Sequence, residues 1–187
     1  MQVFLETDRL ILRQFTADDA DLIVELDSDP EVRRHVQLKP TTRTEAAGEI
    51  LPAWLRYYDR YRGYSFWAAI ERASGEFIGW FHLRPGLTDG RDDEPELGYR
   101  LRRASWGRGY ATEGSQALID KAFIDLGAQL VWAETMSVNA ASRRVMEKAG
   151  LRFVGTIFQD WPEKLPGDEE GDVRYAITRE EWEQDRR

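Results

Sequence analysis

The residues best suited to chemistry lie in a glycine-rich turn that follows a strand-like run. Gly107 and Gly109 enclose Arg108, and apolar residues at helical spacing begin just after them. Such a turn leaves backbone N–H groups unpaired at the positive end of a helix dipole, and glycine allows a phosphate to approach closely. Three arginines add positive charge here: Arg102, Arg103 and Arg108. These features predict an anion site, and the alternative is an ordinary strand-to-helix turn.

Two common phosphate-binding motifs do not describe this turn. The dinucleotide fingerprint Gly-x-Gly-x-x-Gly fails because Thr112 occupies its third glycine position. The P-loop fails because no Gly-Lys-Ser/Thr follows the glycines. An anion site at this turn therefore belongs to a different kind of fold.

The pattern of apolar residues predicts the elements that must position the turn. Short apolar or alternating runs predict about seven strands, over residues 5–15, 64–71, 76–83, 95–103, 130–136, 151–159 and 172–177. Helical spacing predicts about four helices: one after Thr16, one after Thr42 or Thr44 with a kink or break at Pro52, one from the glycine turn to Gly127, and one over 140–149.

The order of these elements predicts the fold class. A strand is followed by two helices, three strands, a helix, a strand, a helix and two strands. A hairpin followed by a strand–helix–strand unit implies an α+β fold with a mixed sheet and packed helices. The length of 187 residues suits a single domain over residues 1–187.

Composition excludes several classes of function. The chain has no cysteine, which removes disulfides, thiol catalysis and thiolate zinc sites, and its two histidines are far apart in sequence. The formal net charge of −8 argues against a nucleic-acid-binding surface and against adsorption to anionic membranes, and it suits a cationic partner such as an amine. Without a membrane-length apolar run or a signal peptide, we expect a cytoplasmic protein with no bound metal.

Several segments, in order, resemble one known family. They are Thr7-Asp-Arg-Leu-Ile-Leu-Arg13, Glu96-Leu-Gly-Tyr99, Trp106-Gly-Arg-Gly-Tyr-Ala-Thr-Glu113, Asn139-Ala-Ala-Ser142 and Glu147-Lys-Ala-Gly-Leu-Arg-Phe153. Together with the predicted elements they resemble the GNAT superfamily of acyl-CoA-dependent N-acetyltransferases, specifically its RimJ/RimL-type branch. The resemblance covers nearly the whole chain. It implies acetyl-CoA as co-substrate and a mostly antiparallel central sheet flanked by helices.

The resemblance also implies where the phosphates of acetyl-CoA bind. The family's loop pattern Gln/Arg-x-x-Gly-x-Gly/Ala maps to Trp106-x-x-Gly109-x-Ala111, with Trp106 in place of Gln or Arg. The loop residues expected to contact acetyl-CoA are Arg103, Trp106, Gly107, Arg108, Gly109, Tyr110, Ala111 and Thr112. Glu113, in the first turn of the following helix, is interpreted as structural.

The pantetheine arm is expected in a gap between two splayed strands. The resemblance implies that it lies along the backbone of Tyr99, Arg100 and Leu101. Asn139 matches a cofactor-contacting asparagine of the family, and it fits a helix N-cap equally well.

Acetyl transfer to an amine needs a base for the amine proton and a donor for the leaving thiolate. Glu96, at the start of the cofactor-binding strand, is the expected base, and Glu94 acting through water is the alternative. Ser142 is expected to hydrogen-bond the CoA sulfur, unless it is only a helix-end hydroxyl. Many members of the family place an acidic tyrosine where this chain has Met146. That departure leaves a catalytically inactive acyl-CoA-binding sensor as the alternative function.

The sequence does not specify the amine acceptor. A protein N-terminus and a small-molecule amine both remain candidates, and the protein is expected to be a monomer or a homodimer. The element order places the acceptor between the two early helices, which carry Trp54 and Tyr58, and the acidic loop 161–171. Aromatic rings and acids there would suit an ammonium group. His82 either lines this pocket or is an ordinary half-buried histidine.

Overall fold

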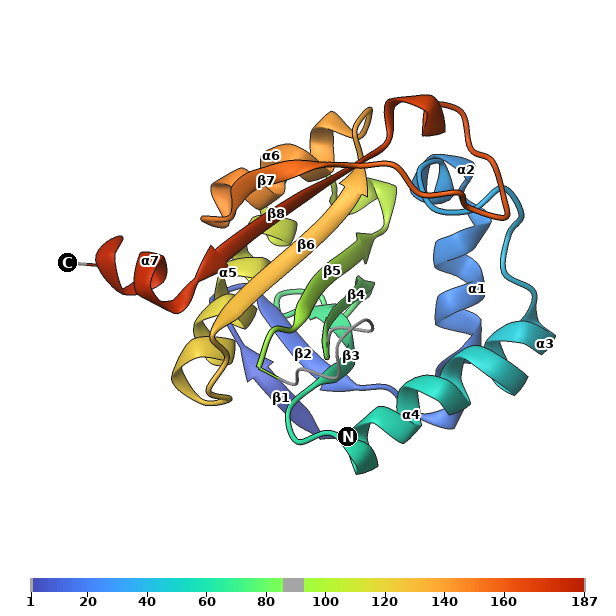
Figure 1. Ribbon diagram of the computed structural model, residues 1–187. Coiled ribbons are helices and arrows are strands. Elements are labelled where there is room, and N and C mark those ends of the chain that lie inside the picture. Colours follow the sequence, from blue (N-terminus) through green and yellow to red (C-terminus); the bar gives the residue numbers. More distant parts are fainter. Residues whose placement is uncertain (1, 86–92, 187) are drawn as a thin grey trace.

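The chain folds around one eight-stranded sheet with helices on both faces (Figure 1). The computed structural model describes residues 2–85 and 93–186. The strand order is β1-β2-β3-β4-β5-β6-β8-β7, and every neighbouring pair is antiparallel except β5 and β6. The strands are β1 Val3–Glu6, β2 Leu10–Gln14, β3 Ser65–Glu71, β4 Phe77–Arg84, β5 Glu96–Leu101, β6 Leu130–Met136, β7 Arg152–Ile157 and β8 Asp172–Thr178. The predicted α+β fold with a mixed sheet is confirmed.

The helices fall into an early group and a later group along the chain. The early group is η1 Ala17–Asp19, α1 Ala20–Ser28, α2 Pro30–Arg33, α3 Arg43–Glu45, η2 Ala46–Ile50 and α4 Leu51–Arg60. The later group is η3 Arg103–Ser105, α5 Tyr110–Ile124, α6 Ala140–Lys148, η4 Asp168–Glu170 and α7 Arg179–Gln184. Across the described residues, no helix combines the length and apolar character needed to cross a bilayer.

Alternation along the central strands gives the sheet two apolar faces. Trp67 of β3 and Phe81 of β4 belong to a buried cluster with Leu118 of α5. Their sequence neighbours Phe66 and Trp80 belong to a second cluster, which includes residues of α1 and α4. The early helices and α5 therefore cover opposite faces of the sheet.

The N-terminal residues form a hairpin, so the prediction of one strand over 5–15 is wrong. β1 and β2 pair antiparallel, and the turn closes where the Thr7 N–H donates to the Leu10 carbonyl at 2.9 Å. Thr7 and Arg9 lie in the turn between the two strands, and the side chains of both bind Glu113 of α5. This split explains why the sheet has eight strands rather than about seven.

The predicted kink at Pro52 takes the form of a π-helical turn. Thr42 caps α3, where its hydroxyl accepts from the Glu45 N–H at 3.2 Å. The π turn η2 follows, and α4 begins at Leu51, one residue before the proline. Because Pro52 has no N–H to donate, a change of hydrogen-bond register just before it lets the helical path continue.

β5 and β6 are neighbours that pair at one position. Within these two strands the register is Glu96↔Trp132, where the Trp132 N–H donates to the Pro95 carbonyl at 3.2 Å. On its other side, β6 pairs with β8 from Leu130 through Met136. The two parallel strands therefore diverge after Glu96, as the family resemblance implies.

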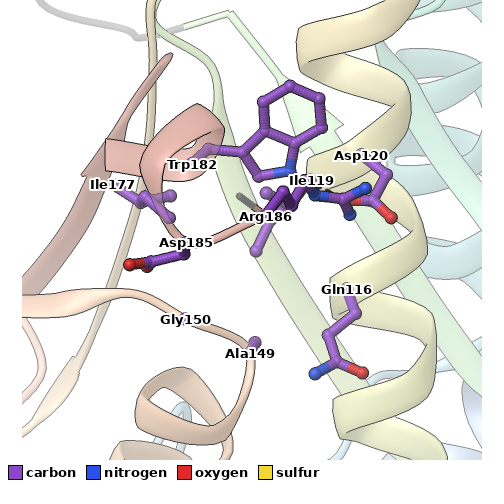
Figure 2. A pocket seen from close by; sticks show the side chains of 9 residues that line it. All are labelled: Gln116, Ile119, Asp120, Ala149, Gly150, Ile177, Trp182, Asp185 and Arg186. Atoms are coloured by element: carbon purple, nitrogen blue, oxygen red, sulfur yellow. Dashed lines mark hydrogen bonds and ion pairs between the residues drawn. The ribbon is translucent and has the colours of Figure 1, made fainter. Parts of the chain in front are cut away.

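The C-terminal helix α7 was not predicted from the sequence. A capping box of Thr178 and Glu181 starts it, and the Trp182 Nε1–H donates to Asp120 of α5 at 2.9 Å. Figure 2 shows Trp182 and Arg186 beside Asp120 at a pocket of about 360 Å³. This pocket lies among α5, the α6–β7 turn, β8 and α7, and no site residue expected from the sequence lines it.

Candidate active site

The glycine turn exposes backbone N–H groups at the start of α5. Gly107 and Gly109 have φ angles of 70° and 84°, in the left-handed region that favours glycine. No side chain caps the helix at Gly109, whose carbonyl accepts from the Glu113 N–H at 3.0 Å. Residues 110–112 precede that bond, so their N–H groups have no intrahelical partner and form an anion-binding end.

Two carboxylates hold the turn: Glu113 in the first turn of α5 and Glu71 at the end of β3. Glu113 accepts from Arg9 Nε at 2.6 Å, and Arg9 Nη1 donates to the Arg108 carbonyl at 2.8 Å. Glu71, at the end of β3, accepts from the Tyr110 hydroxyl and pairs with Arg108 at 3.1 Å. The conformation of the turn is therefore fixed by side chains that lie outside it, and Glu113 contacts other parts of the fold as a structural residue does.

The arginines of the turn do not converge on one point. Arg102 reaches α1 and pairs with Glu25 at 2.7 Å. Arg108 pairs with Glu71, yet its side chain remains 54% exposed. Arg103 is exposed and forms no ion pair within the described part of the chain. Attraction of a phosphate to this turn therefore falls to Arg103 and Arg108 together with the helix end.

Alternate residues of β5 turn their backbone groups toward the gap beside β6. The Arg102 N–H donates to a β4 carbonyl at 2.8 Å, and a Cβ added at Gly79 of β4 would come within 2.1 Å of the Arg100 carbonyl. Because successive peptide groups alternate in direction, Tyr99 and Leu101 face the opposite side, toward β6. Two of the three expected pantetheine contacts thus line the gap, and Arg100 faces β4.

The side chain of Arg100 joins the sheet to α1. Its Nη1 lies 2.5 Å from Asp27, a carboxylate that is 3% exposed and also accepts from the Thr41 hydroxyl. Trp106 folds back so that its Nε1–H donates to the Leu101 carbonyl at 2.8 Å. The Leu101 carbonyl is therefore already occupied, whereas its N–H remains directed at the gap.

Tyr99 and Ser142 form a hydroxyl pair between β5 and α6. Tyr99 Oη lies 3.0 Å from Ser142 Oγ and donates to the Ser142 carbonyl at 3.1 Å. Burial raises the pKa of Tyr99 to about 12, so the phenol is protonated at neutral pH. Asn139 caps α6 by accepting from the Ser142 N–H at 3.2 Å, and its amide donates to Thr135 at 3.0 Å. Met146, in the family's tyrosine position, is buried and offers no proton.

Glu96 lies at the start of the gap beside Arg84 and His82. Its Oε2 is 2.6 Å from Arg84 Nη2, and its Oε1 is 3.6 Å from His82 Nε2. Burial alone would raise the pKa of Glu96, but His82 and Arg84 together hold it below its ordinary value. Glu96 is therefore ionised at neutral pH, and its tie to Arg84 makes it a weak base by itself.

Carboxylates near the gap are paired with arginines. Asp27 pairs with Arg100, Glu96 with Arg84, and Glu134 of β6 with Arg174 of β8. These three acids therefore carry little free negative charge toward an ammonium group.

The loop after β7 reaches the early helices, as the element order suggested. Glu163 accepts from the Leu38 N–H, just after α2, at 3.0 Å. Trp161 is tied to its own loop because its Nε1–H donates to Asp172 at 2.8 Å. Figure 1 shows this segment beside α2. The loop thus closes one side of the space in front of the sheet.

Trp54 and Tyr58, which the sequence placed near the acceptor, both contact the sheet. Trp54 stacks on Phe66 of β3 with ring centroids 4.3 Å apart. The Tyr58 hydroxyl accepts from the Phe15 N–H at 2.9 Å and donates to the Phe66 carbonyl. Both side chains therefore fasten α4 to the sheet.

Two features of the site were not predicted from the sequence. One is the Tyr99 hydroxyl at Ser142, and the other is the contact between His82 and Glu96. The contact between His82 and Glu96 could be predicted once the strand register is known. His82 pairs with Gly98, and Glu96 lies two residues before Gly98 on the same face of the sheet. Among the described residues, no group of three potential metal-binding side chains gathers.

A mixed sheet with one diverging parallel pair beside an uncapped helix start is the arrangement that the resemblance to acyl-CoA-dependent N-acetyltransferases implied. Residues 9–152 match the family model described as the acetyltransferase (GNAT) domain, and the chain belongs to this family. The family resemblance stated from the sequence is confirmed.

Comparison with known proteins gives relatives and a fold neighbour. The chain is 40% identical over 188 residues to the FsC-acetyl coenzyme A-N(2)-transacetylase of Aspergillus fumigatus, which covers 97% of this chain and 78% of that protein. It is 32% identical over 155 residues to the uncharacterized N-acetyltransferase YoaA of Bacillus subtilis, covering 83% and 86%. Its fold matches RimL, a ribosomal L7/L12 alpha-N-protein acetyltransferase solved with coenzyme A, at a TM-score of 0.78 and 18% identity over 95% of this chain and 98% of that chain.

These matches establish the general activity. The chain is an acyltransferase enzyme, an N-acetyltransferase that uses acetyl-CoA as co-substrate. At 18% identity the likeness to RimL shows the fold.

Proposed function

We propose that this enzyme acetylates the primary amine of a small molecule. The observation that supports a transfer site is the divergence of β5 from β6 next to the uncapped start of α5. The Aspergillus fumigatus relative supports a small acceptor, because its name specifies transfer at a nitrogen numbered N(2), as atoms of a defined compound are numbered. A protein N-terminus is the acceptor in the name of RimL, a much less similar protein.

Two segments of the chain suit the two ends of acetyl-CoA. The CoA phosphates would lie on the N–H groups of residues 107–112, with Arg103, Trp106 and Arg108 around them. The pantetheine arm would follow β5, where the Tyr99 backbone and the Leu101 N–H face the gap without a β6 partner. Asn139 would contribute mainly by capping α6, because both polar ends of its amide already have partners.

The reaction joins the amine nitrogen to the acetyl carbon and breaks the carbon–sulfur bond. We assign removal of the amine proton to Glu96, the one carboxylate of β5, and Glu94 acting through water is the alternative. We assign the hydrogen bond to the leaving sulfur to Ser142, whose Oγ is held near Tyr99. The chain has no cysteine, so the acetyl group passes to the amine with no cysteine thioester on the enzyme.

The binding part of this proposal is tested by ligand-dependent stability. A ligand at 100 times its Kd adds about 2.7 kcal/mol to the free energy of unfolding. Acetyl-CoA and CoA should raise the Tm, whereas NAD and ATP should not. Equal shifts with all four compounds would contradict a dedicated acyl-CoA site.

The acceptor is tested by thiol release from acetyl-CoA. Small primary amines, including amino acids, polyamines and amino sugars, are compared with peptides that carry free N-termini, and matched N-acetylated compounds serve as controls. We expect turnover with members of the small-amine set. Turnover confined to the peptides would contradict a small acceptor, and thiol release from none would contradict the transfer itself.

A further inference from the structure

We propose that the imidazole of His82 accepts the proton of the attacking amine and that Glu96 is its carboxylate partner. This inference rests on the proposed N-acetyltransferase function and deepens it. It changes the role of Glu96 from a base acting alone to a residue that positions and stabilises a histidine.

The location of the His82 ring supports this role. His82 lies on β4 directly opposite Gly98 of β5. A Cβ added at Gly98 would come within 2.4 Å of the imidazole, so the ring occupies the space that a side chain of β5 would otherwise fill. Neighbouring strands are about 4.8 Å apart, so the ring lies over β5, the strand that borders the gap.

The ring of His82 also lacks hydrogen bonds to the described residues. His82 is 7% exposed, and neither ring nitrogen has a hydrogen-bond partner within the described residues. Nε2 lies 3.6 Å from Glu96 Oε1, too far for a hydrogen bond and close enough for an ionic contact. Buried polar atoms are almost always paired, so a buried histidine without a partner calls for a ligand or a catalytic role.

The rings and charges around His82 set its protonation state. The rings of Phe66 and Trp80 lie 4.8 Å and 5.7 Å from the imidazole. The charged groups facing it are Glu96 and Arg100 on β5 and Arg84 on its own strand, with Asp27 of α1 behind Arg100. Burial lowers the pKa of His82, the two arginines act in the same direction, and Glu96 opposes them. The imidazole is therefore neutral at neutral pH and has a lone pair to accept a proton.

With the Nε2–H of His82 directed at Glu96, the Nδ1 lone pair takes the proton of the amine as its nitrogen bonds the acetyl carbon. The carbon–sulfur bond breaks, and the CoA thiolate gains a proton from solvent through Ser142. The imidazolium is stabilised by Glu96 until it returns its proton to solvent. Arg84 keeps Glu96 ionised throughout, which is the state that this role requires.

The kinetic test compares His82→Gln with His35→Gln, the same substitution at the other histidine. In the wild type, kcat/KM for the amine should fall at low pH as His82 becomes protonated. In His82→Gln this fall at low pH, the acid limb of the profile, should disappear. Its kcat should be lower by about 10²–10⁴-fold, the usual range for general base catalysis. The Tm shift with acetyl-CoA should be unchanged. An active His82→Gln enzyme that keeps the acid limb would overturn the inference.

A second measurement does not depend on activity. Because the chain has two histidines, the imidazole NMR signals of the active His35→Gln protein belong to His82 alone. The His82 signal should titrate below pH 6.5, and Glu96→Gln should move that titration to still lower pH. If the His82 signal titrates at the same pH in Glu96→Gln, the two side chains do not interact, and the proposed pair is overturned. A wild type without any acetyl transfer would instead contradict the proposed function.

Discussion

At the scale of single residues, the proposed stabilisation of the leaving sulfur depends on two hydroxyl groups. Ser142 has a high intrinsic pKa, so it serves better as a hydrogen-bond donor than as an acid. Tyr99 Oη lies 3.0 Å from its Oγ and approaches from β5, the strand that borders the gap. A neighbouring phenol both fixes the serine rotamer and polarises its hydroxyl through a short hydrogen-bond chain.

Tyr99→Phe tests this pair because it removes one oxygen and keeps the ring. We expect the free energy of unfolding to fall by about 0.5–1.5 kcal/mol, the net contribution of a typical hydrogen bond. We also expect kcat to fall severalfold with little change in the KM for acetyl-CoA. Urea unfolding and thiol release measure the two effects. In a double-mutant cycle, adding Tyr99→Phe to Ser142→Ala should reduce kcat little further, and full additivity would show that the hydroxyls act independently.

At this scale the sequence predicted the backbone part of the site better than the side chains. Gly107, Gly109 and Glu96 were predictable, because turn chemistry and strand position are local properties. The contacts of the Tyr99 hydroxyl and of the His82 imidazole were not, because they depend on partners across strands or on another helix. Cross-strand register is set by the whole sheet.

At the scale of elements, the N-terminal hairpin serves as a brace for the glycine turn. Its Arg9 binds Glu113 and also the Arg108 carbonyl, so one side chain connects two ends of the turn. Loops are mobile unless such contacts fix them, and a pre-formed anion site saves the ligand the ordering entropy.

Arg9→Ala should therefore weaken acetyl-CoA binding more than it slows the chemistry. We expect the Kd for acetyl-CoA to rise about 5–50-fold, with kcat at saturation changed less than threefold, because the loss is about 1–2 kcal/mol of charge-assisted hydrogen bonding. Isothermal titration measures the Kd. Arg43→Ala, which removes an exposed ion pair to Asp21, is the matched control and should leave the Kd unchanged. Equal effects of the two variants would contradict the brace.

Glycines in two helices should respond in opposite ways to an added methyl group. A Cβ at Gly114 of α5 would lie 2.4 Å from the Phe81 ring, whereas a Cβ at Gly48 meets nothing within 4 Å. Gly114→Ala should lower the free energy of unfolding by about 1–3 kcal/mol through overpacking. Gly48→Ala should raise it by about 0.5–1 kcal/mol. Urea unfolding of both variants checks the contrast, and a neutral Gly114→Ala would contradict close packing of α5 on β4.

Most elements were predictable, and the exceptions have physical causes. Strand β6 matches its predicted range of 130–136 because a short, largely apolar run is bounded there by turn residues on both sides. The β1–β2 hairpin was missed because its turn is specified by contacts with Glu113 in α5. Helix α7 was missed although Thr178 and Glu181 have the spacing of a capping box. That local signal is present in the sequence.

At the scale of the whole molecule, positive and negative charges are distributed unevenly. The chain carries a formal charge of −8, yet the acids around the gap are neutralised by arginines while the helix start at the glycine turn remains positive. A polyanion such as CoA is therefore compatible with an acidic protein, because the local potential at the site decides binding.

Stability should fall as the pH is lowered through two windows. The pKa of His82 lies below its ordinary 6.5 because of burial, so the unfolded chain binds that proton first and stability declines as pH drops below about 6.5. The pKa of Glu96 is held below 4.5 by His82 and Arg84 against the effect of burial, which adds a loss below about pH 4.5. Urea unfolding from pH 7.5 to 5 should show a flatter decline for His82→Gln than for wild type. Parallel curves would contradict a buried neutral His82.

The divergence of β5 from β6 makes the sheet two antiparallel halves that share one backbone pairing. This internal seam has unpaired backbone N–H and C=O groups, as the edge of a sheet does, although it lies inside a folded domain. The amides of Tyr99 and Leu101 should exchange with solvent much faster than those of Gly98 and Arg100, which face β4. Acetyl-CoA lying in the seam would act as an added strand, and it should slow exchange at Tyr99 and Leu101 selectively. The co-substrate would then complete the architecture, so that the enzyme has its full sheet only while it holds the group it is about to transfer.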